Sequence, residues 1–356
     1  MSRLDKPKRR SNALVARKMA CLGAVMCCLC SGGGSCPDLI ETPPLGVVTS
    51  GPSNSYGVVQ NLDKPEVNSP PHKSDSSQPP PCIAESAFFK NSPKGFHWPD
   101  RGDELSLRVL EEYGAILVAR GGVVAPLAVI FPDQDAVARW QSSLSTEQAE
   151  LDGVPVRLQS AALRALMKAR EEALQAHLAI SPRGTDAAQR SYDETLELWR
   201  SRVDPGLQHW VDKRLLSAAE ADRLRKLPPR EQALEILKLE NHRLFFSKDF
   251  SKSILFSVAP PGASQHLSML AFDVKEHGNP VVRSILEHHG WFQTVTSDLP
   301  HFTYQGVNEQ LLPSLGLKMV RKGDRVFWIP DLDCPTGAHL ASDAKVFSAS
   351  SVQERP

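Results

Sequence analysis

The stretch Ser264-Gln-His-Leu-Ser-Met-Leu-Ala-Phe-Asp273 and the later stretch Asp298-Leu-Pro-His-Phe302 determine how the second half of this chain is interpreted. Each stretch brings one histidine and one aspartate. A catalytic zinc takes three protein ligands, commonly from His, Asp, Glu or Cys, and keeps one open position at which it activates water. Two histidines and one aspartate meet this requirement, so the two stretches together predict a metal site.

The residues around these side chains predict how they are presented. Gly262 follows two prolines and indicates a turn, so His266 is expected to project from a loop edge while Asp273 lies in the strand that follows. The proline before His301 restrains the preceding residue to an extended conformation. Asp298 and His301 are therefore expected to lie close together without a helix.

The two stretches resemble those of the zinc D-alanyl-D-alanine carboxypeptidases and the related L-alanyl-D-glutamate endolysins. The family pattern is Ser-x-His-x6-Asp, followed later by an acidic residue, two other residues and a histidine. The lead-in Val258-Ala-Pro-Pro-Gly262 is similar to the carboxypeptidase branch, whereas the Asp-x-Pro-His at Asp298 looks closer to the endolysin branch. Met269 stands where the family usually has a glycine.

The resemblance implies a hedgehog/D,D-peptidase-like zinc domain. By that resemblance Zn²⁺ is bound by His266, Asp273 and His301, and Asp298 is the general base. Ser264 is expected to hydrogen-bond a substrate carboxylate or a metal ligand.

The same family places an arginine upstream, in a Ser-Gly-Tyr-Arg-Ser setting, where it holds the substrate and stabilises the developing oxyanion. Ser181-Pro-Arg-Gly184 is the best positional match, which nominates Arg183 as the catalytic arginine. Arg190 is the competing candidate and is expected to bind substrate. The choice between the two arginines stays open at this point.

Apolar runs around the two stretches predict an α+β domain over residues 151–330, with one small antiparallel sheet and several helices. Strands are expected over residues 254–258, 270–274, 292–296 and 326–329. Helices are expected over residues 159–177 and 280–289, and over 186–240 in pieces separated at Pro205-Gly206 and Pro228-Pro229. A short strand over residues 178–180 would lead into the turn at Arg183.

Residues 96–150 predict a separate small α/β unit. Helices are expected over residues 105–112 and 135–143, and strands over residues 115–119 and 123–131. No pattern in this unit points to chemistry.

The two ends of the chain predict export and flexibility. Residues 1–36 combine a basic stretch, an apolar run and small residues, which is typical of a secretory signal; the run is too short to span a bilayer. A membrane or lipid anchor is the other interpretation of this segment. Residues 37–95 are rich in Pro and Ser and predict a disordered linker, and residues 331–356 predict a flexible tail.

Composition excludes some classes of function. The 41 Lys and Arg balance the 41 Asp and Glu, so no net charge would draw the protein to nucleic acid. With the resemblance, the sequence predicts an exported zinc metallopeptidase of the bacterial cell envelope or periplasm that hydrolyses peptidoglycan stem peptides, as a D,D-carboxypeptidase. The alternative is a non-catalytic zinc domain that binds cell-wall peptide. The oligomeric state stays open.

Overall fold

The computed structural model describes residues 85–333 of the chain. The predicted signal or anchor segment, residues 37–84 of the predicted linker and residues 334–356 of the predicted tail lie outside the described residues. The last part of the predicted linker belongs to the folded protein, because it contains the short helix α2 (Ala87–Asn91) with Phe88 buried. Among the described residues, no helix has the length and apolarity needed to cross a membrane.

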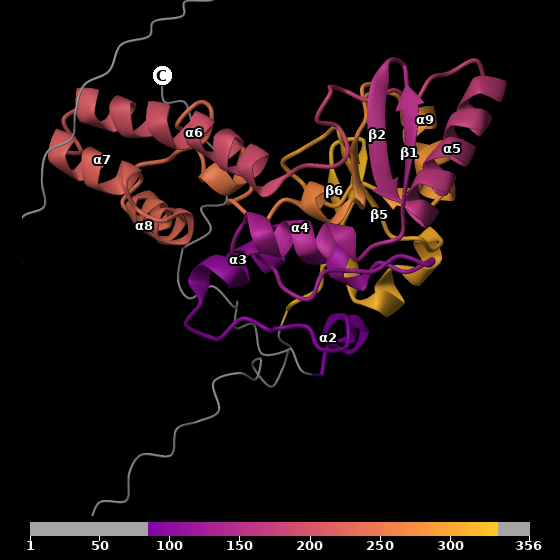
Figure 1. The fold of residues 1–356 in the computed structure, drawn as a ribbon, viewed down its shortest axis with the longest axis horizontal. Helices are drawn as coiled ribbons and strands as arrows, with labels where there is room; N and C mark the ends of the chain where they lie inside the picture. The colour runs from indigo at the N-terminus through magenta and orange to yellow at the C-terminus, as the bar shows by residue number, and fades with distance from the viewer. Residues whose placement is uncertain (1–84, 334–356) are drawn as a thin grey trace, which may run out of the picture. The chain divides into compact units, whose positions relative to one another are not determined.

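The helices begin where the sequence supplies capping side chains. Aspartates cap the first turns of α3 (Glu104–Tyr113) and α4 (Gln134–Ser142), and a serine and a glutamate form a capping box at the start of α6 (Tyr192–Asp212). The other long helices are α5 (Ser160–Gln175), α7 (Ala218–Arg225), α8 (Pro229–Asn241) and α9 (Pro280–His288). Figure 1 shows α6, α7 and α8 grouped on the side of the folded region opposite to α5 and α9.

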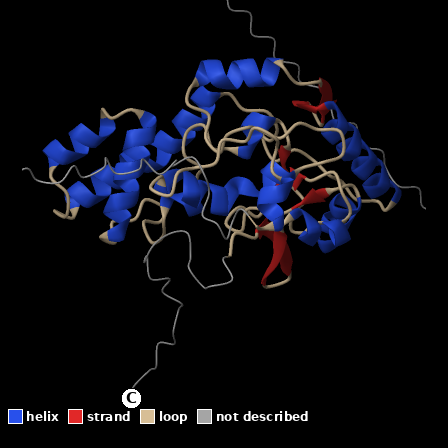
Figure 2. Ribbon diagram, turned by 90° about the horizontal axis from the view of Figure 1, so that it is seen from below, coloured by secondary structure: helices blue, strands red, loops and turns tan. Residues whose placement is uncertain are grey.

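The strands form small antiparallel sheets rather than the single sheet expected. The described elements are β1 (Thr146–Leu151) with β2 (Val154–Gln159), β3 (Ala271–Asp273) with β5 (His301–Tyr304) and β4 (Trp291–Phe292), and β6 (Leu317–Lys322) with β7 (Arg325–Pro330). Figure 2 shows how short these strands are beside the helices. The mixture of helices and small antiparallel sheets confirms the α+β class.

The boundary expected between residues 150 and 151 falls inside the β1–β2 hairpin. Asp152 and Gly153 form its two-residue turn with φ of 52° and 81°, the backbone that an Asp-Gly hairpin turn adopts. One hydrophobic cluster also contains residues from both sides, including Leu110 and Phe302. Residues 96–150 and 151–330 therefore share a core.

Four predicted strands are wrong, and a fifth, expected over residues 292–296, overlaps β4 only at Phe292. Residues 115–119 fall largely in a buried 3₁₀ helix, Gly114–Val118, and residues 254–258 begin with another, Ile254–Phe256. Residues 123–131 have no regular structure, and beside residues 178–180 the chain makes only an isolated bridge between Pro182 and Val274. Short apolar runs are buried in either conformation, so their sequence does not distinguish a strand from a buried turn of helix.

The helical region has its own hydrophobic cluster. Trp199, Val203 and Leu207 of α6 pack in it with Phe246 and residues of α7 and α8. The break expected at Pro205-Gly206 is wrong, because α6 continues through Pro205. The break at Pro228-Pro229 is confirmed, since α8 begins at Pro229.

Candidate metal centre

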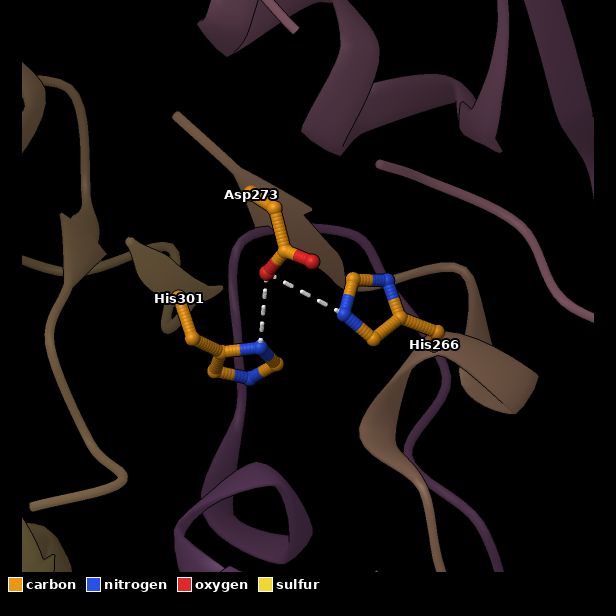
Figure 3. A group of neighbouring side chains, drawn as sticks. All are labelled: His266, Asp273 and His301. Carbon is orange, nitrogen blue, oxygen red and sulfur yellow. Dashed lines mark hydrogen bonds and ion pairs between the residues drawn. The ribbon is translucent and has the colours of Figure 1, made fainter. Parts of the chain in front are cut away.

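Two of the candidate ligands come from neighbouring strands of the three-stranded sheet, and the third comes from the 3₁₀ helix that precedes it. Asp273, the last residue of β3, is the direct cross-strand partner of His301, the first residue of β5. His266 lies in the 3₁₀ helix Gln265–Ser268, and the chain then passes through Met269 in the left-handed conformation, with φ of 54°, before it enters β3. The fold thus turns the three side chains toward one another (Figure 3).

The distances from Asp273 to the two histidines are compatible with a tetrahedral zinc ion. Asp273 Oδ1 lies 3.3 Å from His266 Nε2 and 3.2 Å from His301 Nδ1, and the three ligand atoms all lie within 4.8 Å of one another. All three residues are buried. Zinc bonds of about 2.0–2.1 Å would place two ligand atoms about 3.3 Å apart in a tetrahedron, which agrees with both distances to Asp273.

The hydrogen bonds of His266 direct a lone pair toward Asp273. Its Nδ1 lies 2.6 Å from the carbonyl oxygen of Ala188, which can only accept, so Nδ1 donates. Burial lowers the pKa of His266, and the positive charge of Arg190 lowers it further, which favours the neutral ring. In the neutral ring Nε2 carries no proton and presents a lone pair to Asp273.

Gln265 gives His301 the same arrangement. His301 Nε2 lies 2.9 Å from Gln265 Oε1, and the orientation of this amide follows from its other end, where Nε2 donates to the carbonyl oxygen of Tyr113 at 2.7 Å. His301 Nε2 therefore donates, and in the neutral ring its Nδ1 presents a lone pair to Asp273. Two imidazole nitrogens and a carboxylate oxygen therefore lie together, and these are ligand types that Zn²⁺ binds.

Arg190 balances the charge of this group. Its Nη2 lies 3.1 Å from Asp273 Oδ2 and 3.1 Å from Asp186 Oδ2, and its side chain is mostly buried. In this structure the guanidinium of Arg190 is occupied by the two aspartates, so it holds a candidate ligand in place.

The segment that carries both candidate arginines is bound to the ligand residues through its backbone. The amide of Arg183 donates to the carbonyl oxygen of Asp273 at 2.9 Å, and the amide of Asp273 donates to that of Ala187 at 2.8 Å. The carbonyl of Ala188 accepts from His266, as described above. Residues far apart in the sequence are therefore assembled into one site.

All seven residues nominated from the sequence line one pocket of about 530 Å³. The side chains of Asp298 and Arg183 are exposed, and Ser264 is half-buried. Arg183 makes no ion pair with any residue between 85 and 333, which leaves its guanidinium available to a ligand. The pocket therefore contains a buried donor set, an accessible carboxylate and an accessible guanidinium.

Sequence reasoning missed Gln265 as part of this site. Glutamine occupies many surface positions, and nothing in the local pattern marks this one. Its proximity to His266 in the sequence is the only signal, and that signal does not indicate that its amide contacts His301.

Compared with protein-family models, with curated proteins and with solved structures, the chain matches none of them. The family resemblance carried by the two stretches therefore stays a prediction.

Proposed function

We propose that this protein is a zinc metallopeptidase with a hedgehog/D,D-peptidase-like domain, which hydrolyses peptidoglycan stem peptides as a D,D-carboxypeptidase. The convergence of His266 Nε2, Asp273 Oδ1 and His301 Nδ1 carries the proposal, because all three atoms lie together in a pocket large enough for a peptide. Zinc, when bound there, would supply a Lewis acid that polarises the peptide carbonyl and acidifies water.

Asp298 and Arg183 have complementary parts in the proposed reaction. Asp298 is an exposed carboxylate in the pocket, and it would take the proton from the attacking water and pass it to the leaving amine. Arg183 would donate hydrogen bonds to the carbonyl oxygen as its negative charge develops. Ser264, at the same pocket, would hydrogen-bond a substrate carboxylate.

The proposed place of action follows from the N-terminal pattern alone. A protein exported to the bacterial cell envelope or periplasm would meet peptidoglycan there. The signal or anchor segment supports this part of the proposal only as a sequence pattern, since it lies outside the described residues.

The test is hydrolysis of a peptide that ends in D-Ala-D-Ala by zinc-loaded, purified protein. We expect release of D-alanine, loss of activity on chelation and its recovery with added zinc. Asp298→Asn should lower kcat by about 100-fold or more while zinc content stays unchanged, because it removes the proton acceptor and no ligand. Asp100→Asn, an exposed aspartate outside the pocket, is the matched control.

Two results would count against the enzyme. Zinc-loaded protein that cleaves neither carboxypeptidase nor endopeptidase substrates refutes the peptidase proposal. Peptide binding without turnover would instead support the alternative, a non-catalytic zinc domain that binds cell-wall peptide.

A further inference from the structure

The pocket of the candidate metal centre has a second group of lining residues, which come from the helical region. Leu198 and Arg202 lie four residues apart on α6 and so share one face of that helix. Lys248 and Phe256 come from the chain that follows α8. We call these four residues the distal group.

The cations of the distal group have no carboxylate partner among residues 85–333. Arg202 is held by hydroxyl groups, with Nε 3.0 Å from Ser257 Oγ and Nη1 2.9 Å from Ser201 Oγ. Lys248 is exposed. The two positive charges are therefore not neutralised inside the described protein.

The acidic residue next to Lys248 in the sequence is used elsewhere. Asp249, beside Lys248, lies 2.7 Å from the hydroxyl oxygens of Ser247 and of Ser251, which donate to it. On the metal side of the pocket, Asp186 and Asp273 are paired with Arg190. Arg202 and Lys248 thus add two cations without a carboxylate partner to a pocket in which Asp186 and Asp273 are already paired with Arg190.

Apolar surface accompanies these cations. Phe256 is 42% exposed although it is a large apolar side chain, and the half-buried Leu198 lines the same pocket. A pocket lining that combines an exposed aromatic ring with an arginine and a lysine suits a ligand that has both an apolar stem and an anionic group. A peptide residue with a carboxylate side chain has this combination.

We propose that Arg202 and Lys248 form a subsite for a side-chain carboxylate of the peptide, on a residue upstream of the bond that is cleaved. This inference rests on the proposed peptidase function and adds the substrate class, namely acidic peptides. Because the distal group belongs to the helical region and contacts none of the candidate ligands, it determines which peptide binds and leaves the reacting groups unchanged.

The experiment compares two D-Ala-D-Ala peptides that differ only in carrying Glu or Gln at the upstream positions. Zinc-loaded protein with the native sequence should show a KM about tenfold lower for the Glu peptide, since a charge-assisted hydrogen bond contributes about that much. The double variant Arg202→Gln, Lys248→Gln should lose this preference by raising KM for the Glu peptide, with kcat and the Gln peptide unaffected. Arg200→Gln, an exposed arginine of α6 that does not line the pocket, is the matched control.

The outcomes separate this inference from the proposed function. If the native protein treats both peptides alike, or if the double variant affects them equally, the carboxylate subsite is refuted. If neither peptide is hydrolysed, the peptidase proposal fails, and the same variants are then compared by binding of fluorescent peptides. A Glu preference in Kd that the double variant loses would still support the subsite, and its absence would refute it.

Folding of the variants is checked by thermal melting. Should the double variant melt early, Lys248→Gln alone replaces it, because Lys248 is exposed and no hydrogen bond of the described residues involves its side chain. This single variant should lose part of the Glu preference and melt like the native protein.

Discussion

At the scale of single residues, the candidate centre depends on which nitrogen of each histidine carries its proton. The outer nitrogens, His266 Nδ1 and His301 Nε2, donate hydrogen bonds to Ala188 and Gln265. In the neutral rings, the inner nitrogens that face Asp273 therefore carry the lone pairs that could bind a metal cation. An acceptor on the outer side therefore helps to orient each ligand ring.

Gln265 offers a test of this dependence. Gln265→Met removes the acceptor of His301 and keeps a side chain of similar length, so we expect zinc affinity to fall by about 10–100-fold. Competition with a chromophoric chelator measures the change. Gln265→Glu, which keeps an acceptor oxygen, is the control and should bind zinc more tightly than the Met variant; equal affinities for the native protein and the Met variant would refute the role of Gln265.

The sequence predicted the three candidate metal ligands but could not distinguish the two arginines. The ligand set could be nominated because few residue types bind zinc and their spacing was distinctive, and the structure brings His266, Asp273 and His301 together. The two arginines could not be distinguished, because the difference between them lies in their partners. Arg190 pairs with Asp273, whereas Arg183 makes no ion pair among the described residues.

At the scale of elements, α6 is placed by a close approach to the chain after α8. A Cβ atom on Gly206 would lie 2.4 Å from the ring of Phe246, and both residues are buried in the cluster of the helical region. Glycine is therefore required inside this helix for packing, although it weakens the helix by about 1 kcal/mol relative to alanine.

Gly206→Ala tests which of these effects is larger. The gain in helix propensity is about 1 kcal/mol, whereas forcing a methyl group into a packed core costs about 1–3 kcal/mol. Phe246 is fully buried and its ring has little room to move, so we expect a net loss of stability of about 1 kcal/mol. Urea unfolding measures it, and a variant more stable than the native protein would contradict the packing argument.

The elements that sequence reasoning predicted best are the long amphipathic helices. Their spacing and caps are local signals, and α3, α4, α5 and α9 lie close to where they were expected. The strands were harder, because β5 has only four residues and is defined by its pairing with β3 and β4. Pairing between distant segments leaves little trace in a short stretch of sequence.

At the scale of the whole molecule, we expect a metal ion bound at the candidate centre to add stability to a fold that can form without it. Two hydrophobic clusters, one around the sheets and one in the helical region, bury large side chains such as Trp291 and Trp199 without any contribution from the metal ligands. Removal of zinc is therefore expected to weaken the protein without unfolding it.

Thermal melting with and without zinc tests this expectation. Zinc at 100 times its Kd should stabilise the protein by about 2.7 kcal/mol, which raises Tm by about 5–10 °C for a domain of this size. His266→Ala should abolish the shift, because it removes one of three ligands. A Tm that zinc does not change would exclude a tight metal site, and complete unfolding on chelation would contradict the independence of the two clusters.

The cross-strand pairing of Asp273 with His301 has a consequence for how the protein matures. Side chains alternate between the two faces of a strand, so sliding β3 past β5 by a single position would send one of these groups to the wrong face. A chain mispaired in this way cannot assemble the donor set. Only molecules in which β3 and β5 pair in the correct register would accordingly bind zinc. The metal content of a preparation would therefore report its fraction of correctly folded chains.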